Sequence, residues 1–84
     1  MALSDNLQGP WFMEGDKHEP CAIYQQGEVL LVVNEHGSLA TGYTTGETKF
    51  TIAHGEGWQS GLHADIADGG KTIIWRNGST VWRR

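Results

Sequence analysis

The chain has little cysteine and little basic charge, and each shortage excludes a class of protein. A single cysteine, Cys21, among 84 residues rules out an intramolecular disulfide, so we do not expect a disulfide-stapled secreted scaffold. Residues 1–7 lack the basic start and apolar run of a signal peptide. The longest apolar run, Val29 to Val33, is far too short to span a bilayer. We therefore expect a cytoplasmic protein without a membrane partner.

Positive charge is also scarce. Six Lys and Arg residues oppose ten Asp and Glu residues, for a net charge of −4. Three of the basic residues, Arg76, Arg83 and Arg84, lie in the last nine positions. Nucleic-acid binding needs a clustered positive field that replaces condensed counterions. A mostly acidic chain with one basic end predicts no nucleic-acid partner.

Glycine, in contrast, is abundant: twelve glycines separate segments rich in Val, Ile, Thr, Tyr and Trp. This spacing is typical of short strands joined by tight turns. We predict strands over 11–14, 21–26, 28–34, 38–44, 48–53, 62–66, 71–76 and 79–83. Asn77-Gly78 is the strongest hairpin signal, because both central residues of a type I′ turn need positive φ. No window has a sustained helical period, and one helical turn over Ser4 to Gln8 is the best helix candidate.

These strands predict an all-β fold in a single domain, residues 1–84, with residues 1–9 as an N-terminal segment. Every connection is short, so sequential strands should pair antiparallel as a meander. An open sheet would leave two exposed edges, and closure removes them. We therefore predict a small β-barrel of about six to eight short strands. Such a barrel is either filled by side chains or holds one small ligand at its mouth.

The strand over 28–34 is apolar on both faces, which is unusual for so small a domain. A partner that covers the outer face would explain this pattern. We expect a homodimer whose interface uses Val29, Leu31 and Val33.

Residues with side chains suited to a small ligand suggest a binding site. The four tryptophans supply broad rings that either fill a thin core or stack on a ligand. Trp58 follows the loop His54-Gly55-Glu56-Gly57 and is the best candidate for stacking. Asn34 and Glu35 lie in the turn that ends the most apolar strand, where they serve either the turn or a ligand. Gln25 and Tyr43 are polar groups in apolar strands, and they would define a site if they face inward.

An enzyme remains a third alternative. His63 with Asp65 share a face of one strand, and Glu35 adjoins His36. Solvated surface residues produce the same patterns. The chain has no histidine or cysteine spacing for a metal and no phosphate-binding glycine loop, so we expect no metal and no cofactor. Cys21 follows Pro20 at a strand start and precedes Ala22, which indicates an inert buried thiol.

The opening of the chain resembles the avidin and streptavidin barrels. There a tryptophan strand leads into hairpins and a Gly-Thr-Tyr segment, and here Trp11, the hairpin at Gly27 and Gly42-Tyr43-Thr44 are comparable. The likeness covers about the first half of the chain. It implies an up-and-down barrel with one open mouth, and it does not extend to biotin binding. The function we expect is non-catalytic binding of a small, partly apolar ligand, with assembly into a homodimer as the alternative.

Overall fold

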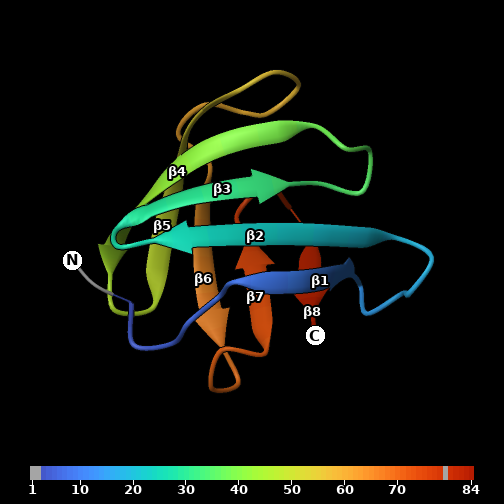
Figure 1. The fold of residues 1–84 in the computed structure, drawn as a ribbon, viewed down its shortest axis with the longest axis horizontal. Coiled ribbons are helices and arrows are strands. Elements are labelled where there is room, and N and C mark those ends of the chain that lie inside the picture. Colours follow the sequence, from blue (N-terminus) through green and yellow to red (C-terminus); the bar gives the residue numbers. More distant parts are fainter. Residues whose placement is uncertain (1–2, 79) are drawn as a thin grey trace.

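The computed structural model describes residues 3–78 and 80–84, which form eight antiparallel strands and no helix. The strands are β1 (Gly9–Met13), β2 (Pro20–Gln26), β3 (Val29–Val33), β4 (Leu39–Gly46), β5 (Lys49–Gly55), β6 (His63–Ala67), β7 (Thr72–Trp75) and β8 (Val81–Arg83). Each strand pairs with the next, and β8 pairs with β1 to close the ring (Figure 1). The predicted all-β meander and its closure into a barrel are confirmed, and the strand ends differ by at most two residues from those expected.

Alternation along most of the strands fills the barrel with apolar side chains. In β3, Leu30 and Val32 are fully buried, while Val29 and Leu31 are exposed. Their neighbours across the β3–β4 ladder are the small inward residues Gly42 and Ala40. Small residues on one wall leave room for large ones on the others. The largest fully buried side chains are Trp11, Trp75, Trp82, Phe50, Leu7, Ile23, Leu30, Ile52, Ile73 and Val32.

Two glycines let β4 and β5 approach each other closely. A Cβ at Gly55 would lie 2.5 Å from the Cβ of Ala40, its ladder partner. A Cβ at Gly42 would lie 2.8 Å from the carbonyl oxygen of Thr51, beside a register shift in the same ladder. Glycine within a strand commonly marks a bulge or a close backbone approach. These two positions therefore set the bend of the barrel wall.

The N-terminal segment closes one end of the barrel. The helical turn expected over Ser4 to Gln8 does not form, and residues 4–8 make bends and irregular backbone instead. Leu7 is fully buried; its amide donates to Gln25 Oε1 at 2.9 Å, and its carbonyl accepts from Trp11 Nε1 at 2.8 Å. Arg84 donates to the carbonyl oxygen of Asn6 and lies over the ring of Trp11. These long-range partners replace the local bonds of a helical turn, so the segment plugs the end.

The hairpin between β7 and β8 forms with a longer loop than the sequence predicts. Trp75 N donates to the carbonyl oxygen of Thr80, so the connection covers residues 76–79, of which Ser79 lies outside the described residues. Gly78 has a φ of +125°, but among the described non-glycine residues only Glu14 and Asp68 have positive φ. Asn77 therefore does not take the conformation of a two-residue type I′ turn.

Candidate functional site

A cavity opens at the end of the barrel opposite the N-terminal plug. In a meander, alternate connections lie at the same end, so the β1–β2, β3–β4, β5–β6 and β7–β8 loops all surround this mouth (Figure 1). The cavity has a volume of about 320 Å³. The described residues that line it are Met13, Asn34, Glu35, Gly57, Trp58, Gln59, Leu62, Trp75, Asn77, Thr80 and Trp82. They come from both ends of the sequence and from three of the four loops.

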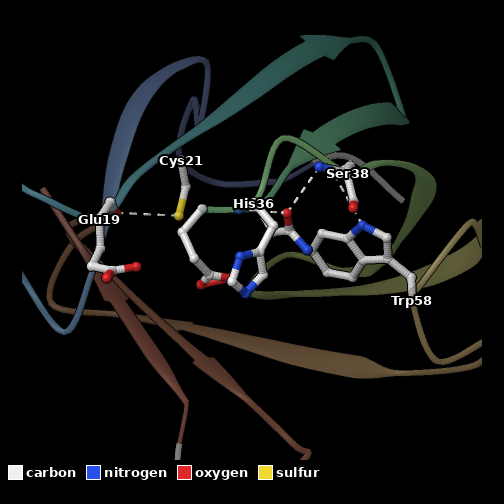
Figure 2. Close-up of polar contacts among 7 residues, drawn as sticks. Glu19, Cys21, His36, Ser38 and Trp58 are labelled. Carbon is white, nitrogen blue, oxygen red and sulfur yellow. Dashed lines mark hydrogen bonds and ion pairs between the residues drawn. The ribbon is translucent and has the colours of Figure 1, made fainter.

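Three tryptophans form one side of the cavity. The rings of Trp75 and Trp82 have centroids 5.0 Å apart, and those of Trp58 and Trp75 are 5.5 Å apart. Trp75 and Trp82 are buried at the base, whereas Trp58 from the β5–β6 loop is only partly buried. Trp58 is fixed because its Nε1 donates to the carbonyl oxygen of Ser38 at 3.1 Å (Figure 2). Such tilted and edge-on ring contacts are favourable and hold the aromatic wall in place.

Asn34 shapes the β3–β4 turn, which also borders the cavity. Its Oδ1 accepts from the amides of His36 at 3.0 Å and of Ser38 at 2.9 Å, and its carbonyl accepts from Gly37 N. A side-chain amide that satisfies the backbone of the following turn is a common use of asparagine. Asn34 therefore makes these hydrogen bonds of the turn, and the side chain of Glu35 takes part in none of them.

Glu35 turns inward, not out to solvent. Only 10% of its side chain is exposed, and its Oε1 lies 3.9 Å from Nε2 of His36, whose side chain is 79% exposed. Its Oε2 is buried without a hydrogen-bond partner among the described residues. Burial raises the pKa of the Cys21 thiol to about 12, and the charge of Glu35 adds to that rise. The carboxylate of Glu35 is thus mostly buried, and one of its oxygens lacks a partner among the described residues.

A second buried polar atom belongs to another residue of the cavity wall, Trp75. Trp75 is 2% exposed, and its Nε1 has no acceptor within the described part of the chain. A buried polar group without a partner costs about 1–3 kcal/mol, and such groups are rare in native proteins. Two residues of the cavity wall therefore each carry a buried atom without a partner in the described part of the chain: an acceptor on Glu35 and a donor on Trp75.

The structure brings together three of the five residues predicted to bind a ligand. Asn34, Glu35 and Trp58 line the cavity. Gln25 shares the inward face of β2 but lies at the plugged end, where its Oε1 accepts from the Leu7 amide. Tyr43 is on the outer wall, 47% exposed, opposite Val29 on β3. Neither Gln25 nor Tyr43 contacts the mouth cavity.

Of the two catalytic pairs considered from sequence, His63 and Asp65 are engaged elsewhere. His63 Nδ1 lies 2.8 Å from Oγ1 of Thr51, and Asp65 pairs with Arg76. No group of three or more His, Cys, Asp or Glu side chains within residues 3–78 and 80–84 is arranged to hold a metal ion. In the same residues, no helix has the length and apolar character of a membrane span.

Two residues of the cavity carried no specific role in the sequence. Trp75 and Trp82 are inward residues of the last hairpin and look like core filling, which they also are. Their place in the sequence could have indicated a role in the site: Trp75 and Trp82 lie in the two strands that flank the 76–79 loop, at the same end of the barrel as Trp58. In a meander, the β5–β6 and β7–β8 loops lie at the same end of the barrel, so the predicted strand order would have placed Trp58, Trp75 and Trp82 near one another.

Comparisons of the chain with protein-family models, with curated proteins and with solved structures find no match.

Proposed function

We propose that this protein is a small, non-catalytic binding module whose barrel mouth takes one small, partly apolar or ring-bearing molecule. The observation that carries the proposal is the pair of unpartnered buried atoms, Glu35 Oε2 and Trp75 Nε1, on residues that line one cavity. A ligand that offers both a donor and an acceptor removes both penalties at once. No partner for either atom exists among the described residues.

The shape and lining of the cavity support the proposal. Its volume of about 320 Å³ is at the lower end of the range for small-molecule sites. Trp58, Trp75 and Trp82 offer ring surface, and the few polar groups are placed around it. Small-molecule sites commonly combine mostly apolar walls with a few polar groups that fix orientation.

The resemblance to avidin and streptavidin barrels adds only a precedent for the architecture. Those families are also up-and-down barrels with a site at one mouth. The plug formed by residues 3–8 gives this barrel a single accessible mouth as well. We carry over no ligand from the resemblance, because shared architecture does not establish a shared ligand.

A thermal-shift screen tests the proposal. Sugars, nucleotides, ring-bearing amines and hydrophobic dyes are added at increasing concentration, and a true ligand raises the Tm progressively. Binding should be lost in Trp58→Ala, whose ring is only partly buried, and kept in Tyr24→Ala, which removes an exposed ring from the outer wall. If no compound class shifts the Tm, the proposal is contradicted.

A second candidate role is assembly into a homodimer through the outer wall. Val29 is 56% exposed, and Leu31 beside it is also exposed, with Val33 half-buried on the same face. Across the ladders, Tyr24 and Tyr43 extend this apolar surface. Exposed apolar patches of this kind often mark interfaces. Sedimentation equilibrium should show a dimer that Leu31→Lys converts to monomer, and a monomeric parent at high concentration contradicts this role.

A further inference from the structure

The mouth cavity has an uneven distribution of charge. Glu35 is the one charged side chain among the described residues that line it. The basic group nearest to its carboxylate in the described structure, His36, faces solvent and approaches the other oxygen, Oε1, at 3.9 Å. The buried oxygen, Oε2, therefore belongs to a side chain that lines an aromatic-walled space without a described cationic side chain. This space is the place where a positive charge from outside the chain would be most favourable.

The aromatic wall favours the same sign of charge. The face of a tryptophan ring carries partial negative charge and attracts a cation that lies over it. The rings of Trp58, Trp75 and Trp82 adjoin one another within a centroid spacing of 5.0–6.3 Å. An anionic ligand would meet both these faces and the carboxylate, so both would repel it. A neutral ligand would leave the charge of Glu35 uncompensated.

The indole N–H of Trp75 adds a second requirement. It can only donate a hydrogen bond, so its partner must carry an acceptor atom such as a hydroxyl or carbonyl oxygen. An ammonium group has donors and no acceptor. The ammonium group and the acceptor oxygen must therefore be separate parts of one ligand, joined by an apolar body that packs on the tryptophan rings.

We propose that the mouth binds a small organic cation: an ammonium group pairs with Glu35 Oε2, an apolar or aromatic body packs on Trp58, Trp75 and Trp82, and an oxygen on the ligand accepts from Trp75 Nε1. This inference rests on the proposed function and specifies its ligand class. The ammonium–carboxylate contact is a charge-assisted hydrogen bond, which is roughly twice as strong as a hydrogen bond between neutral groups.

Three matched probes test the charge requirement by isothermal titration calorimetry. Tyramine carries the ammonium, a ring and a phenol oxygen. Tyrosol replaces the ammonium by a hydroxyl, and 4-hydroxyphenylacetate replaces the terminal aminomethyl group by a carboxylate. We expect tyramine to bind roughly 10- to 100-fold more tightly than tyrosol, the range for a hydrogen bond to a charged group. The acid should bind most weakly.

Two variants that each remove one negative charge separate the direct contact between ligand and Glu35 from the effect of the protein's net charge. Glu35→Gln keeps the shape of the side chain and should remove the preference for tyramine over tyrosol. Glu56→Gln changes the net charge equally, but Glu56 is exposed in the β5–β6 loop and does not line the cavity. It should leave the preference intact. Circular dichroism and Tm check that each variant is folded.

The outcomes distinguish the inference from the proposed function. Equal binding of tyramine and tyrosol, or a preference that survives in Glu35→Gln, overturns the cationic ligand while leaving a binding module. The cationic ligand is also overturned, and the binding module kept, if only neutral or anionic compounds from the thermal-shift screen bind. If no compound class binds, both the cationic ligand and the proposed binding function are contradicted. A tyramine preference that is lost in Glu35→Gln alone supports the inference.

Discussion

Replacing the buried carboxylate of Glu35 by an apolar side chain should stabilise the unliganded protein. In Glu35→Met the chain keeps a similar length and volume, and a polar oxygen without a partner is removed from the interior. An unsatisfied buried polar group costs about 1–3 kcal/mol, and more when it is charged. The lost contact with His36 is to an exposed side chain at 3.9 Å and contributes less than about 1 kcal/mol. We expect a net gain of about 1–2 kcal/mol in the free energy of unfolding.

Urea unfolding followed by tryptophan fluorescence measures this gain. For a domain of this size, each kcal/mol corresponds to a Tm rise of about 4–8 °C. The matched control is Glu56→Met, which removes an exposed carboxylate from a neighbouring loop and should change stability by less than about 0.5 kcal/mol. If Glu35→Met unfolds more easily than Glu56→Met, the carboxylate has a stabilising partner and the reasoning about the site is refuted. A gain in stability with a loss of ligand binding is the pattern typical of functional residues.

Three further changes test the fold around the site. Leu7→Ala should lower the free energy of unfolding by about 2–5 kcal/mol in urea titrations, because Leu7 is fully buried in the plug, where its carbonyl accepts from Trp11. Gly55→Ala should destabilise by about 1–3 kcal/mol because its Cβ would lie 2.5 Å from the Cβ of Ala40 and 2.7 Å from the Cα of Ala40. Adding Ala40→Gly should recover little of the loss in a double-mutant cycle, because the clash with the backbone remains. Burial raises the pKa of the Cys21 thiol from 9.0 to about 12, so at pH 9 roughly one thiol in a thousand is ionised in the folded protein, against about half in the unfolded chain. Alkylation at pH 9 should be correspondingly slow until urea is added, and stability should fall as the pH rises from 9 toward 12; rapid alkylation of the folded protein would contradict the burial of Cys21.

The strands and the closed barrel were predictable because their signals are local. Glycine spacing, β-branched residues and alternation each act over a few residues, and the short connections leave the meander as the simplest topology. Loop details were less accessible. Asn77-Gly78 indicates a tight two-residue turn, yet Trp75 pairs with Thr80 and lengthens the loop. The ladder between the two strands, not the intrinsic preference of the turn residues, determines that length.

The binding site was only partly predictable, because the direction of a side chain depends on distant residues. Glu35 in a polar turn looks like a solvated residue, and its burial depends on Asn34, which holds the turn, and on Trp58, which reaches this turn from another loop. Tyr43 has the same local pattern as an inward residue. It faces out because the small residues Ala40 and Gly42 occupy the interior of β4. Alternation predicts that two faces exist, but it does not say which face is buried when the inner residues are small.

The contact between β1 and β8 also completes the mouth of the barrel. That seam consists of the pairs Phe12↔Arg83 and Met13↔Trp82, which join positions about seventy residues apart. Met13 and Trp82 are also wall residues of the cavity. The cavity is consequently completed by the same pairing that completes the ring, and a chain that lacks either outermost strand does not form it. Ligand capture would therefore report that the whole molecule has folded, and a bound ligand would hold its two outermost strands together.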